Sequence, residues 1–307
     1  FLGSTQPSDC SPATARAMAM QSYMRASSVS GSQARFGLGC TAAIATHRER
    51  RGEDRCHIAI QSRGHTTALS LQMSKNMTRA EQEALCTDAI LCLMAQALDI
   101  AAPTQWQRDE RVTGELSRIE APPAWVELLA GERHSTAESR PGAVFPGAFN
   151  PMHDGHREML KVAETYVDGA VALEVSIQNV DKAPLDYFSM QARVDSTAGF
   201  DLVFTDAPTF VEKASIFPGT TFVVGIDTIT RIAEARYYAS TEARDEAIAL
   251  MASLGNRFLV FGRVNGDEFK TLDTVSLLPA LRTLCDGVPE SEFRLDLSST
   301  ELRARNK

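Results

Sequence analysis

Two histidines three residues apart close the segment Phe145-Pro-Gly-Ala-Phe-Asn-Pro-Met-His-Asp-Gly-His156. An apolar stretch ends at Phe145, and Pro151 favours the start of a helix shortly afterwards. At a helix start, His153 and His156 face the same way. Imidazole donors beside the free backbone N–H groups of a helix N-terminus suit phosphate oxygens. The segment therefore predicts a polyphosphate site in preference to a turn that exposes two histidines.

This segment resembles the HxGH nucleotidylyltransferases, whose usual pattern is G-x-F-[DN]-P-x-H-x-G-H. The matching residues are Gly147, Phe149, Asn150, Pro151, His153, Gly155 and His156. The resemblance implies that His153 and His156 contact the phosphates of a nucleoside triphosphate and serve in catalysis. Glycine lets a backbone come close to a ligand. We therefore expect the surrounding residues to bind the nucleotide, and these are Gly147, Ala148, Phe149, Asn150 and Gly155.

A second polar group lies near the end of the sequence, in Asp296-Leu-Ser-Ser-Thr-Glu-Leu-Arg303. Ser298, Ser299 and Thr300 would supply hydroxyl and N–H groups at the start of a last helix, and Arg303 follows one turn later. Alone, this pattern is more typical of a plain N-capped helix. It resembles the I-S-S-T-x-[IL]-R pattern of the same family. The resemblance implies nucleotide binding by the three hydroxyl residues and a catalytic role for Arg303.

A third pattern, Phe222-Val-Val-Gly-Ile-Asp-Thr228, reads as a buried strand that ends in polar residues. Such a strand delivers Gly225 and Asp227 to the carboxyl edge of a sheet, where ligands bind in open α/β folds. The alternative is a plain strand followed by a helix that Asp227 caps. The pattern resembles the family's F-[IV]-[IV]-G-x-D, which borders the nucleotide pocket, so we expect both residues to bind nucleotide.

Substrate contacts are expected from Lys182 and Arg231. In nicotinamide-mononucleotide adenylyltransferases a lysine after the second strand meets phosphate, often within Pro-Pro-His-Lys, and that setting is absent here. A solvated surface lysine is the alternative for Lys182. Arg236 and the tyrosines at 237 and 238 are weaker substrate candidates. Those enzymes commonly stack the nicotinamide ring on tryptophan, and no tryptophan follows position 125.

The elements that must position these residues alternate between strand and helix from residue 142 onward. Apolar strands are predicted at 143–149, 170–177, 201–208, 220–228 and 256–264. A helix is predicted at 155–167. Apolar strands alternating with helices indicate a parallel sheet covered on both faces. We therefore predict an α/β fold with a Rossmann-like nucleotidylyltransferase domain over residues 141–307.

The first half of the chain reads as a second, smaller α/β domain over residues 1–105. Helices are predicted at 12–26 and 78–98, where Thr78 and Glu81 form a capping box, and strands at 34–46, 56–62 and 66–73. Residues 106–140 are predicted to be a proline-containing linker with a short helix around Trp125. Residues 37–42 fit a loose G-x-G-x-x-A pattern, but no acidic residue follows at the spacing a dinucleotide site needs.

The run from residue 7 to residue 98 resembles the C-terminal domain of the CinA family, whose bacterial members are nicotinamide-nucleotide amidohydrolases. Their catalytic signature, Glu-Ser-x-Thr-Gly-Gly, is missing from residues 1–35. We therefore expect this domain to be catalytically inactive. It would instead serve in a homo-oligomer or a larger assembly.

Composition limits the partners. Of the 307 residues, residues 1–140 hold 15 basic and 15 acidic side chains, so the net charge of −8 lies in the second half. This balance argues against nucleic acid, and no apolar run is long enough for a membrane span. The six cysteines include no CxxC pair or zinc spacing. We expect free thiols in a reducing intracellular compartment, cytoplasmic or, after removal of an N-terminal segment, organellar (mitochondrial).

Together, the motifs predict nucleotidyl transfer from ATP to a phosphate-bearing acceptor, with Mg²⁺ held mainly by the phosphates and no protein metal site. The acceptor we expect is nicotinamide mononucleotide, giving NAD and pyrophosphate. The Ser-Ser-Thr form of the last motif favours it, as does a partner domain whose relatives handle the same nucleotide. One alternative is a catalytically reduced, nucleotide-binding or structural subunit of a larger complex. Another is a cytidylyltransferase or phosphopantetheine adenylyltransferase.

Overall fold

The computed structural model describes residues 2, 8–30, 36–47, 51–178, 183–265 and 268–294, apart from the side chains of residues 30, 108 and 265. The chain divides into two compact units. Unit 1 comprises residues 1–132 and 178–191, and unit 2 comprises residues 133–177 and 192–307.

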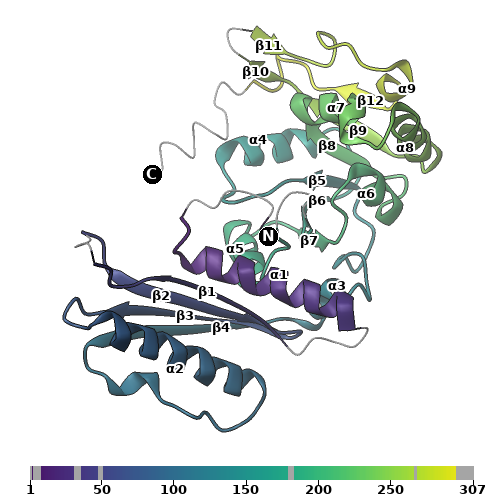
Figure 1. Cartoon of the computed structure of the whole chain (residues 1–307). Helices are drawn as coiled ribbons and strands as arrows, with labels where there is room; N and C mark the ends of the chain where they lie inside the picture. Colours follow the sequence, from purple (N-terminus) through teal and green to yellow (C-terminus); the bar gives the residue numbers. More distant parts are fainter. Residues whose placement is uncertain are drawn as a thin grey trace. The chain divides into compact units, whose positions relative to one another are not determined.

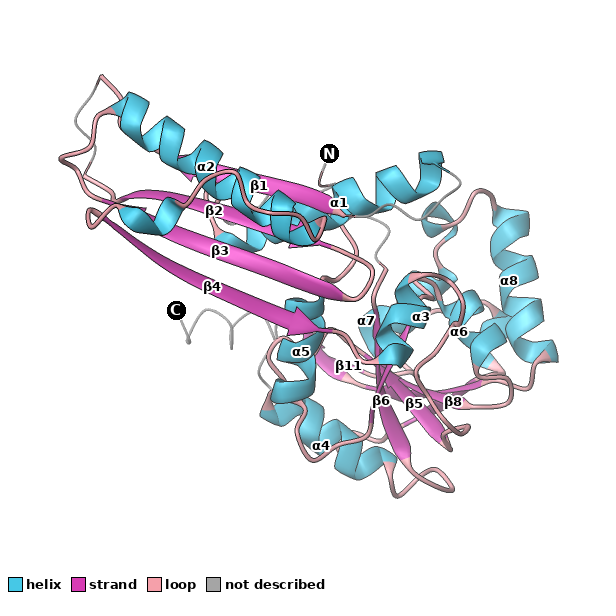
Figure 2. Ribbon diagram, turned by 90° about the horizontal axis from the view of Figure 1, so that it is seen from below, coloured by secondary structure: helices cyan, strands magenta, loops and turns pink. Residues whose placement is uncertain are grey.

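In the described part of unit 1, four antiparallel strands form one sheet in the order β1-β2-β3-β4, and they lie side by side in Figure 2. The strands are β1 (Gly37–Ala43), β2 (Asp54–Gln61), β3 (His65–Met73) and β4 (Val112–Glu120). Alternate residues of a strand point to opposite faces of its sheet. Ile58 and Ile60 of β2 therefore share one face, and Ala59 between them lies on the other.

Helix α2 (Arg79–Ala97) covers the face that carries Ile58 and Ile60 (Figure 1). Its apolar side packs on strands β2 and β3 in a buried cluster. The helix begins as predicted, because Thr78 and Glu81 form the reciprocal hydrogen bonds of a capping box. The structure therefore confirms the two neighbouring strands predicted at 56–62 and 66–73 and the long helix predicted at 78–98.

Helix α1 (Pro12–Ser30) packs on the opposite face, where Ala15 and Ala19 meet Ala59. The backbones of α1 and β1 come so close that a Cβ atom added to Gly39 would lie 2.1 Å from the carbonyl oxygen of Ala15. One added to Gly37 would lie 2.2 Å from the carbonyl oxygen of Ala19. These two glycines therefore serve helix–strand packing, which gives the G-x-G-x-x-A pattern a structural explanation.

Gly39→Ala is expected to destabilise unit 1 by about 1–3 kcal/mol, because the new methyl group overlaps the α1 backbone and forces the helix outward. Urea denaturation followed by tryptophan fluorescence measures the change. Gly64→Ala is the matched control, since nothing lies within 4 Å of a Cβ atom placed at Gly64. Equal stability of both variants would contradict the close packing of α1 on β1.

The structure differs from the predicted linker at residues 106–140. This stretch contains a short 3-10 helix η1 (Trp106–Arg108), the edge strand β4 and helix α3 (Pro123–Leu129). Strand β4 is mostly exposed and polar, so it lacks the apolar alternation that marks a strand in sequence. The short helix around Trp125 is confirmed, with the Trp125 ring stacked at 6.3 Å on that of Tyr187.

Unit 2 contains a parallel sheet, formed by six of the described strands in the order β12-β9-β8-β5-β6-β7. The strands are β5 (Ala143–Pro146), β6 (Val171–Ser176), β7 (Leu202–Thr205), β8 (Thr221–Gly225), β9 (Arg257–Phe261) and β12 (Cys285–Gly287). The predicted α/β fold with a parallel sheet is therefore confirmed. Strand β12 was not predicted, because Cys-Asp-Gly has no strand signature.

Helices connect these strands. They are α4 (Asp154–Ala163), α5 (Tyr187–Ser196), α6 (Phe210–Ile216), α7 (Ile226–Ala233), η2 (Ala235–Tyr237), α8 (Thr241–Ser253) and α9 (Pro279–Arg282). Residues 187–191 of α5 belong to unit 1, and the remainder of that helix belongs to unit 2. A hairpin of β10 (Arg263–Asn265) and β11 (Glu268–Lys270) follows β9.

The main core of unit 2 lies on one face of its sheet. It joins Val144 and Phe222 to apolar residues of α6, α7 and α8. Phe145, the next residue of β5, points to the opposite face and meets His156 of α4. Helix α4 therefore covers the other face. Among the described residues, no helix is both long and apolar enough to cross a membrane.

Candidate functional site

A cavity of about 470 Å³ opens at the carboxyl ends of β5, β8 and β9. From β5 the chain builds β6 and β7 on one side, then returns to add β8, β9 and β12 on the other. Ligands of open α/β sheets bind where the order reverses in this way. The wall consists of Phe145, Pro146, Ala148, His153, Gly155, His156, Met159, Val224, Gly225, Asp227, Thr228, Arg231, Phe261, Gly262, Arg263 and Phe293.

The two histidines lie together in the cavity wall at the start of α4. His153 is the N-cap residue, and its backbone N–H donates to Nδ1 of His156 at 3.3 Å. The rings stack with 3.6 Å between their centroids and 24° between their planes. The structure therefore brings two imidazoles and the positive end of a helix to one place, an arrangement suited to an anion.

Two phenylalanine rings pack against the ring of His156. The rings of Phe149 and Phe145 meet it edge-on, with centroids 5.1 and 6.1 Å away. Phe149 is 1% exposed and has a φ of 41°, in the left-handed region. A Cβ atom on Gly147 would lie 2.6 Å from the Phe149 ring. Glycine at 147 is therefore required by this inward-folded phenylalanine.

Ser196, at the end of α5, fixes the loop between β5 and α4. Its hydroxyl donates to the carbonyl oxygen of Phe149 at 2.7 Å and accepts from the backbone N–H of Met152 at 3.4 Å. Backbone groups on both sides of residue 150 are thus tied to one side chain. Hydrogen bonds at Phe149 and Met152 therefore fix the backbone of the loop that precedes His153.

The facing wall begins at Gly225, the N-cap residue of α7. Nothing lies within 4 Å of a Cβ atom placed on this glycine, so its backbone is open toward the cavity. Asp227, in the first turn of α7, accepts a hydrogen bond from Nη1 of Arg263 at 2.5 Å. The side chains of Asp227 and Arg263 are 44% and 42% exposed, so a ligand in the cavity can reach both.

Arg263 and Phe293 are wall residues that the motifs did not identify. The ring of Phe293 meets that of Phe261 edge-on at 4.9 Å, which gives the cavity an aromatic side. Arg263 lies two residues after β9 ends at Phe261 and falls near the end of the strand predicted at 256–264. A cation at the end of a predicted parallel strand is a usable signal, because the carboxyl ends of such strands share one edge.

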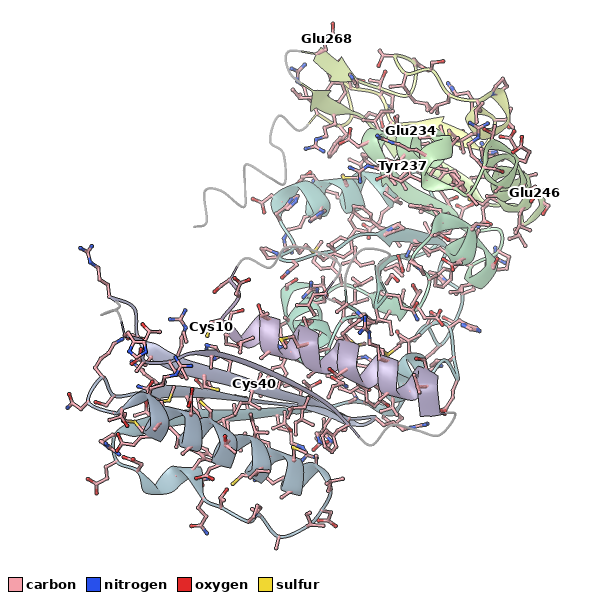
Figure 3. All side chains as sticks on the ribbon, viewed as in Figure 1. Cys10, Cys40, Glu234, Tyr237, Glu246 and Glu268 are labelled. Carbon is pink, nitrogen blue, oxygen red and sulfur yellow. The ribbon has the colours of Figure 1, made fainter. Side chains whose placement is uncertain are left out.

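A second cavity of about 260 Å³ adjoins the first, since Asp227 and Arg231 line both. Its other wall residues include Arg236 and Lys270. Figure 3 labels Glu234 and Tyr237 in this region; Arg236 pairs with Glu234 and lies 4.9 Å above the ring of Tyr237. The cavity therefore combines three cationic side chains with two acidic ones.

Seven predicted site residues line the first cavity: Ala148, His153, Gly155, His156, Gly225, Asp227 and Arg231. Three others lie next to it without lining it: Gly147, Phe149 and Asn150. Phe149 is buried and packs on His156 and Gly147, and its expected contact with nucleotide stays a prediction. The rest lie outside the described residues: Lys182, Ser298, Ser299, Thr300 and Arg303.

No group of three or more His, Cys, Asp or Glu side chains within the described ranges is placed to hold a metal ion. Asp227 supplies a carboxylate in the cavity wall, but it already accepts a hydrogen bond from Arg263.

The reversed strand order, the cavity at the reversal and two helix N-termini facing it define a Rossmann-like α/β domain. The cytidylyltransferase-like family model matches residues 144–305, which is more than half of the chain. The chain therefore belongs to the cytidylyltransferase-like family, and this membership supports nucleotidyl transfer as its class of reaction. No curated protein matches the chain.

Proposed function

We propose that unit 2 transfers the adenylyl group of ATP to nicotinamide mononucleotide, forming NAD and pyrophosphate. The observation that carries the proposal is the stacked pair of imidazoles at the N-terminus of α4. The pair lines a cavity at the point where the strand order reverses. Donors and a helix dipole at that place suit the phosphates of a nucleoside triphosphate.

In this reaction an oxygen of the acceptor phosphate attacks the α-phosphorus of ATP. A new P–O bond forms as the bond to the pyrophosphate oxygen breaks. The acceptor phosphate is already ionised at neutral pH, so the step needs no general base. Catalysis then depends on alignment of the two substrates and on neutralisation of the negative charge that grows on the phosphates.

His153 and His156 are assigned to the triphosphate, because both residues line the cavity at the N-terminus of α4. The N-terminus of α7 faces the same space through Gly225. Arg263 adds a guanidinium that forms bidentate contacts with phosphate readily. The resemblance in the last motif adds Arg303 to the proposed catalytic residues, with Ser298, Ser299 and Thr300 as further donors.

Mg²⁺ bound to the triphosphate would neutralise part of its charge and orient it. Since Asp227 is already paired with Arg263, we propose that phosphate oxygens and water, more than protein groups, would coordinate the ion.

The choice of acceptor rests on the second cavity and on the resemblances. Arg231, Arg236 and Lys270 around that cavity suit a phosphate of a second substrate. Lys182 is proposed to meet the same group. The likeness of residues 1–105 to domains that handle nicotinamide nucleotides remains a prediction and favours the same acceptor.

Cytidylyl transfer is the second candidate, favoured by the family to which the chain belongs. A panel of ATP and CTP against nicotinamide mononucleotide, phosphopantetheine and small phosphorylated alcohols, read as pyrophosphate release, separates the two. NAD formation supports the first proposal, and release with CTP alone supports the second. Calorimetric binding of ATP with no turnover in any combination would favour a nucleotide-binding subunit. The absence of both binding and turnover would reject the nucleotide proposal.

Arg263→Ala is expected to weaken ATP binding at least about tenfold, because it removes a cation and leaves the Asp227 carboxylate facing the phosphates. Calorimetric titration measures the loss. The double variant Asp227→Asn, Arg263→Ala should recover part of it, since the repulsive charge is then gone. Unchanged ATP affinity in the single variant would place the triphosphate elsewhere.

A further inference from the structure

Three of the six cysteines, far apart in sequence, converge in unit 1. Cys40 lies on β1, Cys56 on β2 and Cys86 on α2, on the side of the sheet that α2 covers. The Sγ atoms of Cys40 and Cys56 are 3.7 Å apart, and the thiol of Cys86 is near enough to raise the pKa of Cys56. Figure 3 labels Cys40 on its strand.

The three thiols differ in exposure and in acidity. Cys56 is fully buried, whereas Cys40 and Cys86 are partly exposed. Hydrogen bonding with Cys56 lowers the pKa of Cys40 and of Cys86, and the same contacts raise the pKa of Cys56. A thiolate is the nucleophilic form of cysteine. Cys40 and Cys86, which solvent can reach, are therefore the more reactive thiols. Cys56, the buried thiol next to them, keeps its proton more strongly.

We propose that this cluster is a peroxide-responsive site in which Cys40 and Cys56 form a disulfide. The Cys40 thiolate attacks a peroxide oxygen, the O–O bond breaks, and Cys40 becomes a sulfenic acid while the other oxygen leaves as hydroxide or alkoxide, which takes up the proton that the thiol released on ionising. The Cys56 sulfur then attacks Cys40, the S–O bond breaks, and the released hydroxide takes the Cys56 proton as water. Two thiols are oxidised and one peroxide is reduced.

The neighbouring strands permit this bond. Cys40 and Cys56 are two positions out of register in the β1–β2 ladder, where Ala42 faces Cys56 and Cys40 faces Ile58. Diagonal neighbours on one face of an antiparallel pair are about 7–8 Å apart, so the bond draws Cys40 and Cys56 closer together than they are in the ladder. Strand β1 is at an edge of its sheet, so its shift toward β2 breaks no other ladder, and α1, which packs closely on β1, moves with it. The bond would tie this edge strand to its neighbour.

The test treats the purified 307-residue chain with hydrogen peroxide, unfolds it in guanidinium so that the buried thiols are accessible, blocks the remaining thiols with N-ethylmaleimide and measures the intact mass. We expect two of the six thiols to escape alkylation. Peptide mapping should join residues 36–48 to residues 56–63. Reductant should restore all six. Full alkylation after treatment, or stable sulfinic acid at Cys40 without a cross-link, would overturn the proposal.

Variants locate the bond. Cys40→Ser and Cys56→Ser should each abolish the cross-link, while Cys86→Ser should retain it. Cys10→Ser is the matched control, because Cys10 is also partly exposed but the described structure gives it no thiol contact. Circular dichroism checks that each variant is folded. If either cluster variant fails to fold, peptide mapping of the wild-type chain decides by itself. A cross-link that persists in Cys40→Ser, or joins a different pair, would overturn the assignment.

Discussion

Replacing His156 by alanine is expected to lower turnover at least about 100-fold, the loss that follows removal of one donor to charge developing in a transition state. The ring of His156 is held edge-on by Phe145 and Phe149 and face-on by His153. Little of its orientation therefore has to be established when substrate binds. Steady-state NAD formation from ATP and nicotinamide mononucleotide measures the effect on kcat.

His134→Ala is the matched control for loss of an imidazole in unit 2. His134 is well exposed, pairs with Asp206 at 2.8 Å and does not line the cavity, so its removal should leave turnover unchanged. A thermal melt of both variants tests whether folding is intact. Near wild-type turnover by a folded His156→Ala protein would contradict the assignment of the histidine pair to catalysis.

The histidine pair could be predicted because its geometry is local. Residues three apart at a helix start share a face whatever surrounds them, and the strand before the loop sets where that helix begins. The role of Phe149 could not be predicted in this way. Its inward position depends on a positive φ and on space above Gly147, which arise only when β5, α4 and α5 are packed together. The family pattern marks Phe149 and Gly147 but not the contact between them.

The sequence motifs did not predict the Asp227–Arg263 pair or the cluster of three thiols, because both depend on contacts between distant segments. Asp227 was expected at the carboxyl edge of the sheet. Its hydrogen-bond partner Arg263 is the first residue of β10, 36 residues later in the sequence. The three thiols are likewise brought together by the β1–β2 register and by the face that α2 covers. Neither arrangement has a fixed sequence spacing. Both follow once the strand order and pairing are known.

A buried ion pair in unit 2 leads to the second large expected effect. The carboxylate of Glu174 on β6 is fully buried, and its Oε1 accepts from Nζ of Lys213 on α6 at 2.6 Å. The hydroxyl of Thr205 donates to the same oxygen at 2.5 Å, and Lys213 also donates to the carbonyl oxygen of Ala207. The pair therefore links β6 and β7 to α6 through charge and hydrogen bonds away from water.

Lys213→Met is expected to destabilise unit 2 by about 3–5 kcal/mol, because it leaves a buried carboxylate without its counter-charge. The chain's two tryptophans, Trp106 and Trp125, both lie in unit 1. Fluorescence therefore does not follow unit 2, and urea denaturation should be read by circular dichroism and by amide hydrogen exchange over residues 171–176. Lys161→Ala, which removes an exposed lysine from α4, should change stability by less than about 0.5 kcal/mol.

The double variant Glu174→Gln, Lys213→Met separates loss of the pair from loss of one partner. Well-packed neutral replacements of a buried ion pair often cost little, whereas one unpaired charge costs several kcal/mol. The double variant should therefore be more stable than Lys213→Met alone, although Glu174→Gln adds a second substitution to the core. If the two were equally unstable, the lysine would act through its packed methylene chain. If Lys213→Met matched the wild type, the contribution of the Glu174–Lys213 pair to the stability of unit 2 would be contradicted.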